Sequence, residues 1–253
     1  MQKDSDVLRF INEGNPHTRV VGGGFTGDQK HLTHVLVPYE GRIIGALLPV
    51  VPRWMETTHL TLMTILWSVG VVVSGCLAVH NILWLWASSA FIFLQYVTDM
   101  LDGAVGRERG TGLIKWGFYM DHFLDYIFLC AIVCGYSFLL PPSFAALVLL
   151  SLIAAGGFMV HTFLDFAITG DFKISFGWFG ISEVRHVLII FNALVVFFGK
   201  GLLVHVFPFA VAALCIGLCI AVYRSQKLYG SVDMAVKREN DSPVNEHTAV
   251  PTH

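Results

Sequence analysis

Six long apolar stretches, separated by polar or short links, dominate the pattern of this chain from residue 60 onwards. All have about the length of ~20 residues that a helix needs to cross a bilayer, the fifth being the shortest. The stretches are Leu60–Val79, Ile82–Leu101, Trp116–Leu140, Phe144–Phe166, Val184–Phe198 and Leu202–Tyr223. This pattern predicts an all-α integral membrane protein with six transmembrane helices.

The segment ahead of the first stretch has a different character. Residues 1–30 are polar and rich in glycine, and charged residues interrupt any run that could form a signal peptide. Val35–Val51 is apolar, but prolines, glycines and Arg42 divide it, so it is too broken to span a bilayer. It leads to Arg53 and Trp54, a pair typical of anchoring at headgroup level. We therefore predict an N-terminal cytoplasmic and interfacial segment.

The pattern divides the chain into three parts. Residues 1–58 form the N-terminal and interfacial segment, 59–225 the six-helix membrane domain, and 226–253 a polar cytoplasmic tail that we expect to be disordered. Composition agrees with a membrane protein, because 55% of the residues are hydrophobic, 13% are charged and the mean hydropathy is +0.66. A net charge of −2, with no basic stripe among aromatic residues, argues against a nucleic-acid surface.

The distribution of positive charge predicts the orientation of the helices. Among the Lys and Arg residues, only Lys200 lies in one of the three short links, at residues 80–81, 141–143 and 199–201. The others lie at the N-terminus, in or beside the longer links Gly103–Lys115 and Ala167–Glu183, or in the tail. By the positive-inside rule these regions and both termini face the cytoplasm.

Four aspartates flank the link between the second and third stretches. Asp99 and Asp102 end the second stretch and differ by about 60° around a helix, whereas Asp121 and Asp125 lie in the third and differ by about 40°. Each pair therefore shares one helix face. Acids at the membrane rim repel one another and lose hydration, so they need a cationic partner. Carboxylates suit Mg2+ or Mn2+, and two such ions can stabilise an in-line phosphoryl displacement.

The link between the two pairs is expected to form a turn. It is rich in glycine and contains cationic side chains that can lie beside the carboxylates. The conspicuous residues of this region, the four acids included, are Asp99, Asp102, Gly103, Gly106, Arg107, Gly117, Asp121 and Asp125. Their spacing resembles the signature of the CDP-alcohol phosphotransferase family, with seven of the eight fixed positions matching. The departure is Gly106, where the family usually has alanine.

This resemblance implies a six-helix membrane enzyme of phospholipid biosynthesis. Such enzymes transfer a substituted phosphate from a CDP-linked donor to an alcohol and release CMP, and the resemblance also implies a homodimer. The four aspartates would hold the metal ions, with Asp125 as the base that takes the proton of the acceptor hydroxyl. Gly103, Gly106, Arg107 and Gly117 would contact the nucleotide and its diphosphate.

Three residues in and near the motif allow a second interpretation. Gly117 fits a close helix crossing as well as a ligand contact. Outside the motif, Arg185 at the start of the fifth stretch could receive a phosphate or carboxylate of the acceptor, but anchoring at the cytoplasmic face explains it equally well. His122, which directly follows Asp121, is found in the choline and ethanolamine phosphotransferase branch of the family, but a packing role is at least as plausible.

Several functions remain open at this point. We favour CDP-diacylglycerol as the donor, because acyl chains could stay in the bilayer while the diphosphate reaches acids at the rim. The first alternative is a donor of the CDP-choline or CDP-ethanolamine type with diacylglycerol as the acceptor. The second is a divalent-metal or proton-coupled transporter, although transporters usually place their acids near the midplane and contain repeated halves. The third is an inactive relative that acts as a scaffold.

Overall fold

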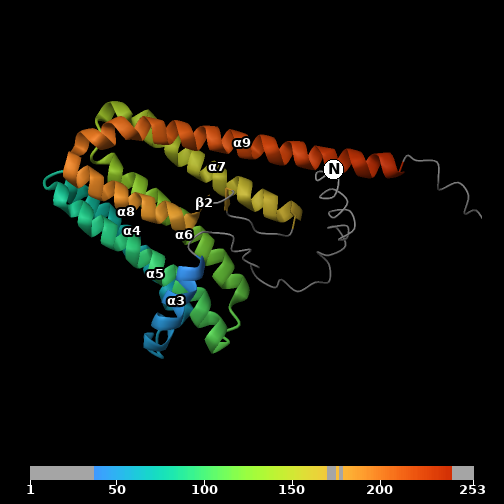
Figure 1. The fold of residues 1–253 in the computed structure, drawn as a ribbon, viewed down its shortest axis with the longest axis horizontal. Coiled ribbons are helices and arrows are strands. Elements are labelled where there is room, and N and C mark those ends of the chain that lie inside the picture. Colours follow the sequence, from blue (N-terminus) through green and yellow to red (C-terminus); the bar gives the residue numbers. More distant parts are fainter. Residues whose placement is uncertain (1–36, 170–174, 177–178, 241–253) are drawn as a thin grey trace, which may run out of the picture. The chain divides into compact units, whose positions relative to one another are not determined.

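The computed structural model describes residues 37–169, 175–176 and 179–240, which are almost entirely helical (Figure 1). The sequence-based expectations for residues 1–36 and 241–253 lie outside the described residues. The longer helices are α3 (Val37–Leu47), α4 (Thr57–Ala78), α5 (Leu85–Arg109), α6 (Ile114–Ser137), α7 (Ala145–Thr169), α8 (Ile181–Phe198) and α9 (Lys200–Asn240). Short 3-10 turns η1 (Leu48–Val50), η2 (Ile82–Trp84) and η3 (Pro142–Phe144) precede α4, α5 and α7, and the two-residue strands β1 (Ser175–Phe176) and β2 (Phe179–Gly180) pair antiparallel.

Each of the six apolar stretches forms a helix, from α4 to α9. Within the described part of the chain, four helical segments are both long and apolar enough to cross a membrane: Thr57–Ala78, Ile114–Ser137, Pro142–Thr169 and Lys200–Arg238. The helical part of the fifth stretch, Val184–Phe198, is shorter, and α5 carries several charged residues at its end. The protein is therefore an all-helical integral membrane protein, and six crossings stay a prediction.

Two helices run further than the apolar pattern suggests. α5 continues to Arg109, so Gly103 and Gly106 are helical, and the turn is confined to residues 110–113. Buried contacts of Ala104 and Val105 outweigh the low helix propensity of the glycines. The turn itself uses positive φ angles at Gly110 (62°) and Gly112 (69°), which glycine adopts readily.

α9 continues to Asn240, beyond the end of the apolar stretch at Tyr223. Residues 226–240, the first part of the tail that we expected to be disordered, are therefore helical. Residues 224–240 include Arg, Gln, Lys, Leu, Met and Ala, all good helix formers, and hydropathy alone does not mark a helix end. The chain divides into two compact units, and residues 24–216 form the unit that contains α3 to α8 and the first part of α9. The remainder of α9 belongs to the other unit.

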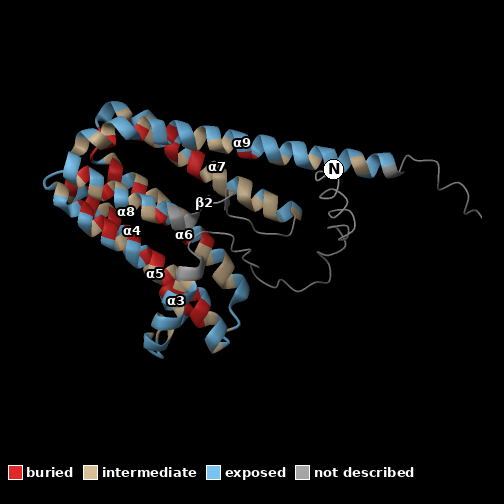
Figure 2. Ribbon diagram, in the orientation of Figure 1, coloured by how far each residue is buried: buried red, intermediate tan, exposed pale blue. Residues whose placement is uncertain are grey.

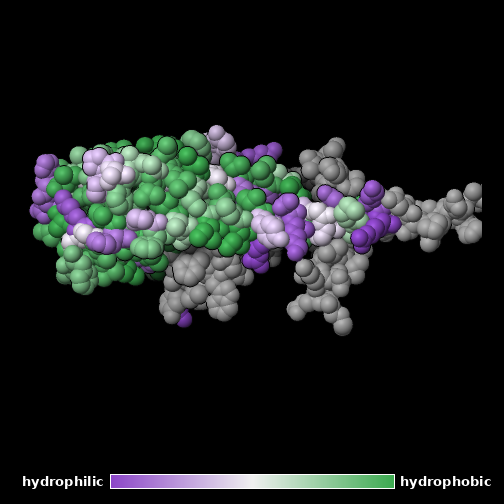
Figure 3. Space-filling model, turned by 90° about the horizontal axis from the view of Figure 1, so that it is seen from above, coloured by the Kyte–Doolittle hydropathy of each residue, from purple (hydrophilic) through white to green (hydrophobic). Residues whose placement is uncertain are grey.

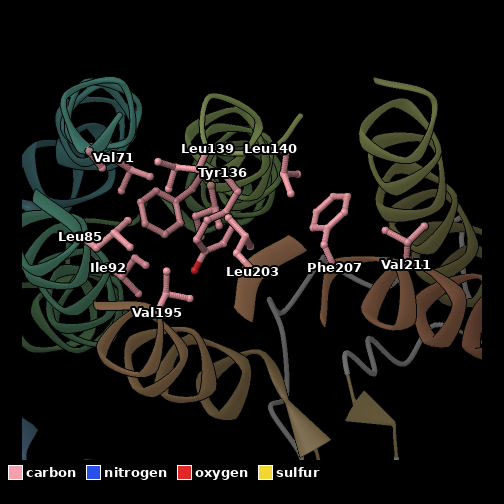
Figure 4. Packing of buried hydrophobic residues seen from close by; sticks show 13 residues of the cluster. Val71, Leu85, Ile92, Tyr136, Leu139, Leu140, Val195, Leu203, Phe207 and Val211 are labelled. Carbon is pink, nitrogen blue, oxygen red and sulfur yellow. The ribbon is translucent and has the colours of Figure 1, made fainter. Parts of the chain in front are cut away.

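The centre of the 24–216 unit is the packing of α4, α5 and α6, on which buried residues are concentrated (Figure 2). α4 and α6 approach closely at Gly75 and Gly135, because a Cβ added to Gly75 would lie 2.5 Å from the Gly135 Cα atom. In the buried apolar cluster, Val71, Ile92, Tyr136 and Val195 point toward one another from four helices (Figure 4). The crossing thus fixes the distance between α4 and α6, the helix that carries Asp121 and Asp125.

Large apolar side chains cover much of the outer surface. One face is mostly hydrophobic (Figure 3), and on α7 only 17% of the apolar window is buried within the protein. Leu149, Ile153, Val160 and Leu164 are exposed along one side of that helix. In water such a surface would be unfavourable, so the hydrocarbon of a bilayer accounts for it.

Candidate active site

Three of the four aspartates meet in one cluster. Asp99 of α5 and Asp121 and Asp125 of α6 each offer one oxygen, and these oxygens lie within 4.8 Å of one another. All three side chains are partly buried. The short turn at residues 110–113 reverses the chain between α5 and α6, and both helices pack against α4, so acids on either side of the turn reach the same level. The predicted convergence of the two helix faces is therefore present for these three residues.

Arg185 of α8 is the cation of this cluster. Its Nη1 donates to Asp99 Oδ2 and its Nη2 to Asp125 Oδ1, each over 2.8 Å. The residue is 5% exposed, so both ion pairs are shielded from solvent. A guanidinium with two forked N–H groups suits two carboxylates on different helices. Arg185 thus lies at the centre of the acids rather than only at the membrane surface.

Gln95 is a site residue that the sequence analysis did not identify. It lies one turn before Asp99 on α5, is 0% exposed, and its Nε2 donates to Asp125 Oδ1 over 3.0 Å. The sequence did contain one signal for this residue. Gln95 is an amide inside an apolar stretch, and it lies four residues before Asp99, so the two side chains share one helix face. Asp125 Oδ1 therefore accepts hydrogen bonds from both α5 and α8.

Asp102 is directed elsewhere. Its Oδ2 accepts a 2.6 Å hydrogen bond from the Thr61 hydroxyl of α4, and its backbone oxygen accepts one from the Thr57 hydroxyl over 3.2 Å. It is not part of the three-acid group. The angle of about 60° between positions three apart on a helix explains the difference, because Asp99 is turned toward α6 and α8 while Asp102 is turned toward α4.

The glycines of the motif differ in their surroundings. A Cβ added to Gly106 would lie 2.8 Å from the Thr57 Oγ1 atom, so this glycine allows α4 to approach α5. At Gly103 the nearest atom would be the flexible end of Arg107, at 3.2 Å. At Gly117 a Cβ would meet nothing within 4 Å, so no helix crossing explains that glycine. The open space beside Gly117 is consistent with a ligand contact.

Two neighbouring residues have structural partners. The Arg109 guanidinium donates to four backbone carbonyls between Val51 and Met55, so it fixes the connection that leads into α4. His122 is buried, with its ring 4.5 Å from that of Phe118 and its Nδ1 2.6 Å from the Phe118 carbonyl oxygen. These contacts agree with the packing interpretation of His122.

Comparison with known proteins identifies the family. Residues 56–223, more than half of the chain, match the CDP-alcohol phosphatidyltransferase family, and this range contains every residue of the cluster. The chain belongs to this family. No curated protein and no solved structure matches the chain significantly. The protein is accordingly a transferase of substituted phosphate groups in phospholipid biosynthesis, with a CDP-linked donor and an alcohol acceptor.

The cluster suits the kind of metal that the family typically uses. Three carboxylates from two helices provide hard oxygen ligands, and their oxygens are close enough to share ions. Oxygen ligands of this type favour Mg2+ or Mn2+ over the softer transition metals. The donor set does not distinguish between these two ions.

Proposed function

We propose that this CDP-alcohol phosphatidyltransferase transfers the phosphatidyl group of CDP-diacylglycerol to an alcohol, with release of CMP, using Mg2+ or Mn2+. The observation that carries the proposal is the convergence of Asp99, Asp121 and Asp125 within 4.8 Å beside Arg185. These aspartates occupy metal-ligand positions of the signature, in a chain that belongs to the family. We propose neither a transporter nor an inactive scaffold, because members of this family are transferases.

The nucleotide side of the site is assigned to the end of α5 and the start of α6. Gly103, Gly106 and Gly117 would let the backbone approach the cytidine diphosphate, and the open space beside Gly117 supports such a contact. Arg107 is exposed near Gly103 and would donate to the diphosphate as negative charge moves to the leaving CMP. These four residues therefore bind and orient the donor.

The metal ligands are assigned to Asp99, Asp121 and Asp125, and two ions are expected, as in the two-metal mechanism of in-line phosphoryl displacement. When bound, the ions supply charge neutralisation for the diphosphate and for the departing CMP oxygen. Asp102 stays a predicted fourth ligand, although one of its oxygens contacts Thr61.

The acceptor side is assigned to Asp125 and Arg185. Asp125 takes the proton of the acceptor hydroxyl, whose oxygen attacks the phosphatidyl phosphorus, and the bond from that phosphorus to CMP breaks with its electron pair going to CMP. Arg185 holds Asp99 and Asp125 in place and would donate to a phosphate or carboxylate on the acceptor. The acceptor would thus lie between α6 and α8.

The proposal also includes the lipid donor, the orientation of the protein in the membrane and its oligomeric state. Exposed apolar side chains on the helices around the site allow acyl chains to remain in hydrocarbon while the diphosphate meets the acids. The alternative donor is of the CDP-choline or CDP-ethanolamine type, and it is supported by the order Asp121–His122. We further propose that the site and both termini face the cytoplasm and that the protein forms a homodimer.

The test measures thermal unfolding of the detergent-solubilised full chain with CMP, with and without Mn2+ or Mg2+. A ligand at 100 times its dissociation constant should add about 2.7 kcal/mol to the free energy of unfolding. We expect stabilisation that needs both CMP and metal and that is lost in Asp99→Asn. Asp165→Asn is the matched control, because Asp165 is an acid of α7 outside the three-acid group.

Activity then distinguishes the donors. The protein in liposomes is given CDP-diacylglycerol or CDP-choline with a panel of alcohols, and CMP release is measured. Release with CDP-diacylglycerol supports the proposal, whereas release only with CDP-choline and diacylglycerol supports the alternative. Absence of any response to CMP, with a response to metal alone, would contradict both.

A further inference from the structure

Two buried amide side chains of the bundle differ in how their polar atoms are partnered. Asn192 of α8 is 0% exposed, its Oδ1 accepts from the Tyr136 hydroxyl over 2.7 Å, and its Nδ2 donates to Ser89 Oγ over 3.1 Å. Both ends of that amide are therefore satisfied by the protein. This is the arrangement expected of a residue whose role is to hold helices together.

Gln95 is equally buried, but only one of the two polar atoms of its amide has a hydrogen-bond partner among the described residues. Its Nε2 donates to Asp125 Oδ1, whereas its Oε1 has no hydrogen-bond partner among the described residues. The amide cannot simply be turned around, since that would place Oε1 against a carboxylate oxygen. A buried acceptor without a donor costs stability, so packing alone would favour an apolar side chain of the same shape here.

The location of Gln95 explains what the amide can do. Asp125 Oδ1 lies between the Gln95 N–H group of α5 and the Arg185 N–H group of α8. Two donors on one oxygen fix the rotation of the carboxylate and hence the direction of its other oxygen. Gln95 is uncharged, so it provides this orientation without competing with a metal ion for the negative charge of Asp125.

We propose that Gln95 is a positioning residue of the transferase site. Its N–H group orients Asp125, and its Oε1 accepts a hydrogen bond from an O–H group that enters the site. The O–H donor comes from a metal-bound water or from the acceptor alcohol, which share this chemistry. The inference rests on the proposed function, because it assigns Asp125 to the metal and acceptor side.

The decisive variant is Gln95→Met, which keeps the length of the side chain and removes both polar groups. Mn2+ binding to the detergent-solubilised full chain is measured by the spin-resonance signal of free Mn2+, and thermal unfolding is measured without added metal. Loss of a residue that orients a ligand typically weakens metal binding by about 10–100-fold. We expect that weakening together with an unfolding temperature that is unchanged or higher.

Asn192→Leu is the matched control, since it replaces an equally buried amide that makes no contact with the acids. It should lower the unfolding temperature and leave the Mn2+ dissociation constant unchanged. Gln95→Asn is a second variant that retains the amide but is one methylene shorter, so it should not reach Asp125. We expect it to weaken Mn2+ binding as Gln95→Met does.

The outcomes separate the two sources of the O–H group. Weaker Mn2+ binding is expected from either source, because the variant also removes the N–H group that orients Asp125. With Mn2+ at saturation, a KM for the acceptor raised about 10-fold or more identifies the alcohol, whereas an unchanged KM identifies the metal-bound water. A lower unfolding temperature with unchanged Mn2+ binding and unchanged KM would overturn the inference and leave the proposed function standing. Failure of the unmodified protein to bind Mn2+ would overturn both.

Discussion

The Nη2 atom of Arg185 lies 2.8 Å from the Oδ1 atom of Asp125, although the two residues are 60 positions apart in the chain. With its second nitrogen 2.8 Å from Asp99, Arg185 joins α8 to both helices of the signature. Taking a charge out of water is costly, and such a pair persists only when both partners stay in place. Arg185 therefore holds α8 against the acids of both α5 and α6.

Arg185→Leu should leave Asp99 and Asp125 without their shared cation. Removing one partner of a buried ion pair typically lowers the free energy of unfolding by about 3–5 kcal/mol. Mn2+ should recover part of this loss, because it neutralises the same carboxylates. Thermal unfolding with and without Mn2+ checks this, and Arg185→Lys is the control that keeps one charge without the forked geometry. An unchanged unfolding temperature in Arg185→Leu would show that the ion pairs add nothing.

Gly75→Ala should weaken the crossing of α4 and α6. The new Cβ would lie 2.5 Å from the Gly135 Cα atom, which is backbone and cannot rotate away. Overpacking of this kind typically lowers the free energy of unfolding by about 1–3 kcal/mol. Gly45→Ala in α3 is the matched control, because a Cβ there meets nothing within 4 Å and alanine favours a helix. Equal unfolding temperatures for the two variants would contradict the close crossing.

Gly106→Ala introduces the residue that the family usually has at this position, yet here it should destabilise the protein. Its Cβ would lie 2.8 Å from Thr57 Oγ1. Thr57→Ala removes that atom, so the two substitutions should be less harmful together than their separate effects predict. Coupling between residues in contact is typically 0.5–3 kcal/mol, and a double-mutant cycle of thermal unfolding measures it. Strict additivity would count against this explanation of Gly106.

Thr61→Val should affect Asp102 without touching the three-acid group. The substitution removes the hydroxyl that donates to Asp102 Oδ2 over 2.6 Å and leaves a buried carboxylate oxygen without that donor. We expect the free energy of unfolding to fall by about 1–3 kcal/mol. Mn2+ binding measured on the same sample tests the predicted ligand role of Asp102, since a change would link this carboxylate to the metals. Thr58→Val, at the start of the same helix, is the control.

Much of the helix arrangement was predictable from the sequence. Apolar runs of membrane length marked the helices α4 to α9, and the four-residue spacing of Asp121 and Asp125 placed them on one face, because both signals depend only on local geometry. The C-terminal ends of α5 and α9 could not be predicted from hydropathy. Their ends depend on packing at Ala104 and Val105 and on helix propensity after Tyr223, neither of which hydropathy reports.

By itself the sequence determined the helical class, the family and the four acids of the motif, since periodicity and motif spacing are properties of one short segment. Only the tertiary structure decided which partners these acids have: Arg185 and Gln95 for Asp125, and Thr61 for Asp102. Those partners lie on helices whose rotation and distance are set by side-chain packing and by the close approach of Gly75 to Gly135. Spacing along one helix contains no information about the rotation of its neighbour.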